Sequence, residues 1–149
     1  MFRVLPALAA LAAVPLLGGC ALSPFGGMFM SPTDCMTRVM YFESNRSSAD
    51  GMLAVGTVVM NRVNDPKFPH SVCGVVGQRN QFADGALWKP MREGRSLALA
   101  RSMADKVLGG YRHPGVGEAK FFHTEGYTFP YNNMHYTWVA GGNAFYEKY

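Results

Sequence analysis

One acid, Glu43, closes an apolar run near the start of the chain and is the residue best suited to chemistry. Its spacing from Met36, Val39 and Met40 follows one face of a helix, so we expect it on the buried stripe. Burial raises a carboxyl pKa, and the end of a helix acts in the same direction. A carboxylic acid that stays protonated near neutral pH can cleave glycosidic bonds as a general acid. The alternative is a structural glutamate paired with a backbone group or with one of three arginines, Arg38, Arg46 or Arg62.

A long polar segment, residues 77–94, carries groups that suit sugar binding. Amides and an acid stand beside two aromatic rings: Gln78, Asn80, Gln81, Asp84, Phe82 and Trp88. Amides bind hydroxyl groups and rings stack on sugar faces, and a loop of this length inside a compact domain is usually functional. An ordinary surface loop with one half-buried tryptophan is the other interpretation.

Histidines and cysteines offer a second kind of chemistry. The four histidines have no recognised zinc spacing, and we expect no metal and no cofactor. His123 paired with Cys35 or Cys73 would suit a cysteine peptidase or amidase. In an exported protein, however, Cys35 and Cys73 are expected to form a disulfide, which argues against that chemistry.

The N-terminus has the design of a secretory signal over residues 1–19. Arg3 precedes an apolar stretch, and residues 17–20, LGGC, resemble a bacterial lipobox. We expect cleavage before Cys20, lipidation of that cysteine and a tether over residues 20–32. Ala21 is not an aspartate, which favours the outer membrane over the inner membrane as the site of the lipid anchor. An ordinary signal peptide with an incidental cysteine is the alternative.

Charge and length restrict the remaining function classes. The net charge of +4 comes without a run of Lys or Arg, which argues against nucleic-acid binding. Residues 33–149 are enough for a single domain with its own core, and we expect a monomer.

The hydrophobic pattern predicts an α+β fold that is mainly helical with a small antiparallel sheet. Helices are expected from Thr33 or Asp34 to about residue 45, and over residues 49–64 and 96–108, with one turn at residues 72–76. Strands are expected over residues 119–124, 136–140 and 144–146, with the last two joined through Gly141, Gly142 and Asn143. The first two helices form a hairpin with Glu43 near its corner.

With these residues in place, the chain resembles the SleB/CwlJ cell wall hydrolase family of spore-cortex-lytic enzymes. Blocks from residue 34 to 146 carry the resemblance, among them Tyr41-Phe42-Glu43, residues 58–63 (VVMNRV), residues 72–76 (VCGVV) and Phe122-His123. It implies a lysozyme-like or lytic-transglycosylase-like fold that cleaves peptidoglycan between N-acetylmuramic acid and N-acetylglucosamine, with Glu43 as acid and base. The expected substrate-binding residues are Gln78, Gln81, Phe82, Asp84, His123 and Tyr131.

Three positions depart from the family pattern. Ser47 stands where relatives have a second glutamate, Tyr131 where they have a tryptophan, and Asn143 where a histidine is common. These departures motivate a second hypothesis, a non-catalytic peptidoglycan-binding lipoprotein. A hydrolytic muramidase, with Asp84 or Asp50 as the second carboxylate, is a third.

Overall fold

The computed structural model describes residues 29–149. The expected signal peptide, Cys20 and most of the tether therefore lie outside the described residues. Within the described part, no helix is both long enough and apolar enough to cross a membrane.

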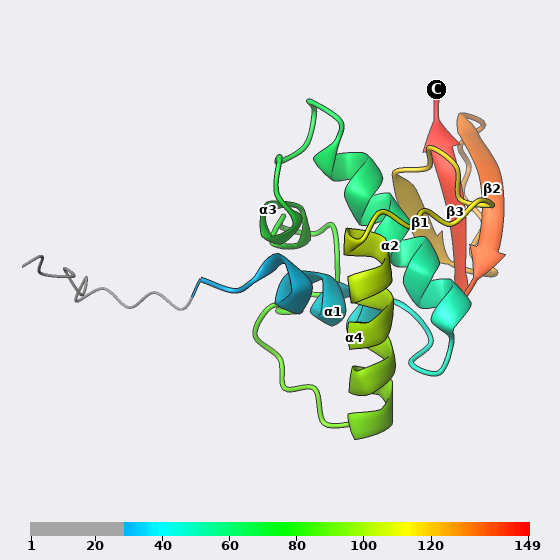
Figure 1. Cartoon of the computed structure of the whole chain (residues 1–149). Helices are drawn as coiled ribbons and strands as arrows, with labels where there is room; N and C mark the ends of the chain where they lie inside the picture. Colours follow the sequence, from blue (N-terminus) through cyan, green and yellow to red (C-terminus); the bar gives the residue numbers. More distant parts are fainter. Residues whose placement is uncertain (1–28) are drawn as a thin grey trace, which may run out of the picture.

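Helices and a small sheet occupy different sides of the domain (Figure 1). The helices are α1 (Pro32–Glu43), α2 (Ala49–Val63), α3 (Val72–Val76) and α4 (Gly94–Leu108). The strands are β1 (Phe121–Thr124), β2 (Met134–Ala140) and β3 (Asn143–Lys148), in the antiparallel order β1-β3-β2. The predicted α+β class is confirmed.

The helix starts show where local sequence was decisive. Ser48 caps α2 by accepting from the Gly51 N–H, a role that serine favours at this position. The prediction for α1 was wrong, because Ser31 is its cap and Pro32 opens the helix inside the predicted tether. Proline suits the first turn, where its missing N–H has no helical partner anyway. Helix α4 also starts earlier than predicted, at Gly94.

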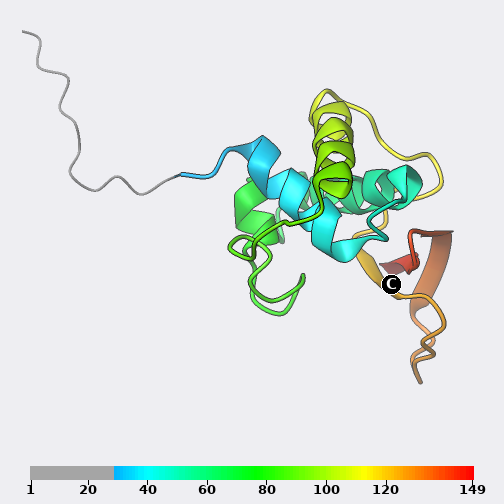
Figure 2. The ribbon, with the colours of Figure 1, turned by 90° about the horizontal axis from the view of Figure 1, so that it is seen from below.

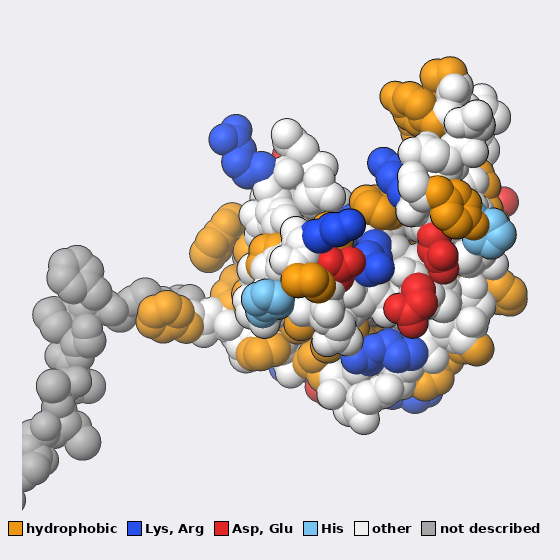
Figure 3. Space-filling model, turned by 90° about the horizontal axis from the view of Figure 1, so that it is seen from above, with side chains coloured by type: hydrophobic (Ala, Val, Ile, Leu, Met, Phe, Trp, Pro, Cys, Tyr) orange, Lys and Arg blue, Asp and Glu red, His pale blue; other side chains and the backbone are white. Residues whose placement is uncertain are grey.

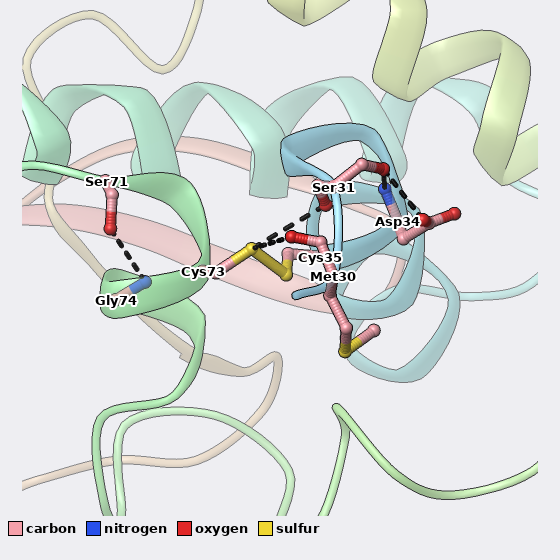
Figure 4. The surroundings of a disulfide bond; sticks show 7 residues. All are labelled: Met30, Ser31, Asp34, Cys35, Ser71, Cys73 and Gly74. Atoms are coloured by element: carbon pink, nitrogen blue, oxygen red, sulfur yellow. Dashed lines mark hydrogen bonds between the residues drawn. A yellow bond between two sulfur atoms is a disulfide. The ribbon is translucent and has the colours of Figure 1, made fainter. Parts of the chain in front are cut away.

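The helices pack around a core of valine, methionine and aromatic side chains. Its fully buried large members include Met36, Val39 and Met40 of α1, Met52, Val55, Val58 and Val59 of α2, and Val107 of α4. The expected disulfide is present between Cys35 of α1 and Cys73 of α3 (Figure 4). It links segments that are 38 residues apart, and it holds the start of α1 against the short helix that precedes the polar segment.

The sheet meets the helices at two glycines. A Cβ on Gly51 of α2 would lie 2.5 Å from the Gly141 Cα, and one on Gly141 would lie 2.7 Å from the Gly51 Cα. Gly141 and Gly142 form the β2–β3 turn with positive φ angles of 58° and 82°, which glycine adopts without strain. Asn143 was predicted in this turn, but it is the first residue of β3.

Candidate active site

A cleft opens at the base of two projecting segments of the domain. The first segment is the polar loop, residues 77–93, and the second is the aromatic arm, residues 126–133, between β1 and β2. Figure 2 shows both projecting on the same side of the domain, with the end of α1 between them. The surface is hollowed between two lobes, and the right-hand lobe ends in hydrophobic side chains (Figure 3). The cleft has a volume of about 390 Å³ and is lined by Glu43, Asn80, Gln81, Phe82, Asp84, Phe122, His123, Thr124 and Asn143.

Glu43 is the last residue of α1 and reaches the cleft half-buried. One carboxylate oxygen, Oε1, accepts a hydrogen bond from the Ala83 N–H of the polar loop. The Glu43 main-chain carbonyl accepts from the side-chain amide of Asn143. Burial raises the pKa of Glu43, although the Ala83 hydrogen bond and the charges of Arg62 and Lys89 oppose that shift. The predicted direction of the pKa shift therefore holds in the structure.

The three arginines that could have paired with Glu43 are engaged elsewhere. Arg38 donates to the main-chain carbonyls of Ala86 and Lys89, and Arg46 forms an ion pair with Glu93. Arg62 donates its Nε–H to the Lys120 carbonyl at 2.7 Å. Across residues 29–149, no cationic side chain lies within ion-pair distance of the Glu43 carboxylate. The arginine form of the structural interpretation is therefore wrong, whereas its backbone form has a partner in the Ala83 N–H.

Arg62 supplies a buried positive charge near the cleft. Its side chain is 3% exposed and stacks on Phe82, a cleft residue, with the guanidinium carbon 5.0 Å from the ring centre. Burial lowers the pKa of Arg62 to about 10, against the opposite influence of Tyr146 and Glu43. At this pKa the guanidinium remains charged at neutral pH, and its field partly offsets the effect of burial on Glu43.

His123 lies on the wall formed by β1, and its hydrogen bonds define its neutral tautomer. Nδ1 lies 2.8 Å from the Thr124 carbonyl oxygen, which can only accept, so Nδ1 carries the proton. Nε2 is then the acceptor for the Tyr136 hydroxyl at 2.8 Å. Both ring nitrogens of His123 are thus engaged with protein groups, and the ring lines the cleft without adding a carboxylate.

Four of the six predicted substrate-binding residues line the cleft with Glu43: Gln81, Phe82, Asp84 and His123. Gln78 does not. Its side-chain oxygen is buried without a hydrogen-bond partner among the described residues, and the residue lines a separate hollow inside the polar loop with Trp88. Tyr131 lies on the aromatic arm rather than in the cleft.

Of the two candidates for a second catalytic carboxylate, Asp84 and Asp50, one lines the cleft and the other does not. Asp84 shares the cleft with Glu43. Asp50 does not line it, and its carboxylate lies 2.8 Å from His113 Nε2 and 3.4 Å from Trp138 Nε1. The proposal of Asp50 as a catalytic carboxylate is therefore wrong, because these two side chains hold it in a different place.

Ser47, the first departure from the family pattern, also lies outside the cleft. Its hydroxyl and main-chain N–H donate to the side-chain oxygen of Asn45 in the α1–α2 connection. The residue borders a different hollow with Arg46 and Glu93. Ser47 itself therefore contributes no group to the cleft that holds Glu43.

Asn143 and Ala83 are the site residues that sequence reasoning missed. Asn143 is 6% exposed and joins the sheet to the end of α1. The substitution of asparagine for the histidine of the family pattern was the available signal for it. Ala83 acts through its main-chain N–H, and a main-chain donor leaves no trace in residue type.

A cysteine nucleophile is excluded for the described part of the chain. Cys35 and Cys73, the two cysteines within residues 29–149, are joined to each other, and Cys35 is fully buried. Neither offers the thiolate that a cysteine peptidase or amidase needs. The cysteine-dependent hypothesis for these residues is therefore wrong.

Comparison with known proteins agrees with this fold. A family model described as cell wall hydrolase matches residues 46–146, and the chain belongs to that family. The match begins three residues after Glu43, so the assignment of Glu43 depends on the geometry above. Over 78 residues the chain is 31% identical to a spore cortex-lytic enzyme of Bacillus subtilis, covering 50% of this chain and 26% of that protein. A spore cortex-lytic enzyme of Oceanobacillus iheyensis is 31% identical over 77 residues, covering 49% of this chain and 28% of that one. The chain thus spans about a quarter of the length of these curated relatives.

Two solved structures share the architecture. The catalytic domain of the Bacillus cereus SleB protein has a TM-score of 0.63 and 25% identity, covering 87% of this chain and 99% of that one. The catalytic domain of the germination-specific lytic transglycosylase SleB from Bacillus anthracis has a TM-score of 0.63 and 24% identity, covering 82% and 98%. The second likeness shows the fold alone.

Proposed function

We propose that this protein cleaves the peptidoglycan glycan strand between N-acetylmuramic acid and N-acetylglucosamine, as a lytic transglycosylase with Glu43 as acid and base. The observation that carries the proposal is a half-buried carboxyl in an open cleft, with a raised pKa and no ion-pair partner among the described residues. Membership of the cell wall hydrolase family and the likeness to the Bacillus cereus domain support it.

The reaction needs one proton carrier. Protonated Glu43 gives its proton to the glycosidic oxygen as the bond from that oxygen to the muramic C1 breaks. The resulting carboxylate then takes the proton of the muramic C6 hydroxyl, whose oxygen closes on C1 to form a 1,6-anhydro ring. Glu43 ends the cycle protonated, and no water is consumed. The Ala83 N–H orients the carboxylate throughout, because it is a fixed main-chain donor to Oε1.

A hydrolytic muramidase is the second candidate, and Asp84 is the observation that favours it. Asp84 lines the cleft with Glu43 and could activate a water or stabilise charge at C1. Hydrolysis would leave a reducing end instead of an anhydro ring, so the product distinguishes the two reactions.

The setting we propose is the cell envelope. The lipobox-like residues before Cys20 support a lipid anchor at that cysteine and a location in the periplasm at the outer membrane. We further propose that the protein acts as a monomer and binds peptidoglycan directly. The anchor is tested by measuring the lipid attached to the Cys20 sulfur in cells that make wild type or Cys20→Ser. A wild-type protein without lipid would contradict this part of the proposal.

The proposed reaction is tested with the full chain, its Glu43→Gln variant and a Glu118→Gln control. Glu118 is exposed and borders a separate hollow. Each protein is incubated with purified peptidoglycan, and mass spectrometry identifies the ends of the released fragments. We expect 1,6-anhydro-muramic ends from wild type and Glu118→Gln, and none from Glu43→Gln.

Two results would contradict the transglycosylase. Reducing ends that disappear in Asp84→Asn would show the hydrolytic muramidase instead. Intact glycan in the presence of bound wild-type protein would show a non-catalytic binding protein.

A further inference from the structure

The aromatic arm extends the cleft wall with rings that the reaction itself does not use. Residues 126–133 read GYTFPYNN and contain no charged side chain. All eight are exposed, and three of them are aromatic: Tyr127, Phe129 and Tyr131. Exposed large rings that gather on one segment commonly mark a binding surface.

A series of ring contacts connects this surface to the cleft. His123, which lines the cleft, meets the Phe129 ring edge-on at a centroid distance of 4.9 Å. Phe129 in turn lies nearly parallel to Tyr131, at 6.0 Å and an interplanar angle of 11°. The rings therefore form one surface that begins beside the reacting bond and continues away from it.

The arm is fixed at both ends by the main chain. The Glu125 N–H donates to the Gly142 carbonyl at its base, and the Tyr149 N–H donates to the Asn133 carbonyl at its other end. The rings are thus held on the sheet, which reduces the ordering cost when a ligand binds.

The composition of the arm selects the ligand class. Flat rings with amides and hydroxyls suit the apolar faces and hydroxyl groups of sugar rings. A surface that binds mainly through anionic groups would call for Lys or Arg here, and a stable protein interface uses about 20–30 residues a side, more than this short arm offers.

We propose that the aromatic arm is a saccharide-binding platform that holds the glycan strand beyond the bond being cleaved, so that the enzyme prefers long strands to short ones. The inference rests on the proposed function of the cleft. It places the expected binding role of Tyr131 on a surface outside the cleft, adds Phe129 to that surface, and adds a dependence on substrate length.

The binding test uses the full chain carrying Glu43→Gln, so that no substrate is consumed. In this background we compare Phe129→Ala/Tyr131→Ala with Phe129→Tyr/Tyr131→Phe, which keeps both rings, and with Tyr111→Ala. Tyr111 is an exposed tyrosine in the segment after α4 and is not part of the arm or the cleft lining. The probes are peptide-free glycan strands of great length and tetrasaccharides of the same repeat, and the readout is the dissociation constant.

We expect the double alanine variant to bind long strands about tenfold more weakly. Its affinity for tetrasaccharides should be unchanged, and the ring-keeping and Tyr111→Ala variants should match their parent. Unchanged binding of long strands would overturn the inference. An equal loss for long and short glycans would also overturn it, because the rings would then belong to the cleft.

The proposed function fails separately. If the chain without any substitution leaves peptidoglycan uncleaved while the arm-dependent binding persists, the chemistry assigned to Glu43 is wrong and the platform stands.

Discussion

The two segments that flank the cleft differ in how they are held and in what they carry. The polar loop is charged and is tied to α1 by side chains: Arg38 binds the carbonyls of Ala86 and Lys89, and the Tyr41 hydroxyl accepts from the Glu93 N–H. The aromatic arm is uncharged and is tied to the sheet by its main chain.

This difference separates chemistry from binding. Any movement of the polar loop moves the Ala83 N–H and Lys89, both of which act on Glu43, so the loop position and the proton affinity of the acid are coupled. The pKa shift of Glu43 has no contribution from the arm. Substitutions on the loop side should therefore change turnover and its pH dependence, and substitutions on the arm should change affinity.

The largest expected effect removes the acid that the polar loop helps to position. Glu43→Gln should lower kcat by about two to four orders of magnitude, the usual contribution of a general acid and base. Affinity for long glycan strands should stay within a small factor of wild type, because the arm is untouched. Steady-state kinetics together with strand binding measures both quantities. A Glu43→Gln variant that lost affinity for long strands while keeping its turnover would contradict the assignment of Glu43 to chemistry and of the arm to binding.

The next effect concerns the disulfide just before the start of the polar loop. Replacing both Cys35 and Cys73 by serine should lower the free energy of unfolding by about 3–4 kcal/mol, because the unfolded chain regains the entropy of a long closed loop. The disulfide lies on the helical side of the cleft, at the short helix that leads into the loop. Urea unfolding with and without reductant checks the value, since reductant should destabilise wild type and leave the variant unchanged. Equal sensitivity of both proteins to reductant would contradict the link.

A smaller effect appears in stability against pH. Burial raises the pKa of Glu43 in the folded state above its value in the unfolded chain. The folded state therefore holds the proton more tightly, and stability falls as pH rises through the folded-state pKa. Glu43→Gln removes this loss, so the variant should be more stable than wild type at neutral pH and lose the advantage in acid. Thermal unfolding at several pH values measures it, with Glu118→Gln as the matched control. Parallel pH profiles for Glu43→Gln and wild type would show that burial does not perturb the acid.

The smallest effect tunes the same acid from the loop. The charge of Lys89 lowers the pKa of Glu43, so Lys89→Ala should raise it. Glu43 would then stay protonated to higher pH, and the alkaline limb of the kcat/KM profile should shift to higher pH. Lys106→Ala, on the exposed side of α4, is the control. Because Lys89 is exposed, the shift should shrink with added salt. A downward shift would contradict the assignment.

Local pattern predicted the helices, the hairpin and Glu43 because each depends on spacing within a few residues. The apolar stripe of α1 was enough to place Glu43 on the inner side of its helix. Gln78 was misplaced because its neighbours in sequence line the cleft while its own side chain turns into the loop interior. Asp50 was misplaced because its partners, His113 and Trp138, come from distant parts of the chain. Contacts of that kind are set by tertiary packing, which one sequence does not reveal.

The contact between Gly51 of α2 and Gly141 of the β2–β3 turn determines how closely the sheet approaches the helices at the candidate active site. Gly141 also accepts, through its carbonyl, from the Asn45 N–H, two residues beyond Glu43, at 2.8 Å. The distance between Glu43 and the sheet is therefore set by direct backbone contact at these two glycines, with no side chain between them. A single methyl group at either glycine would push the β2–β3 turn away from α2 and so change the width of the cleft that Glu43 and Asn143 line.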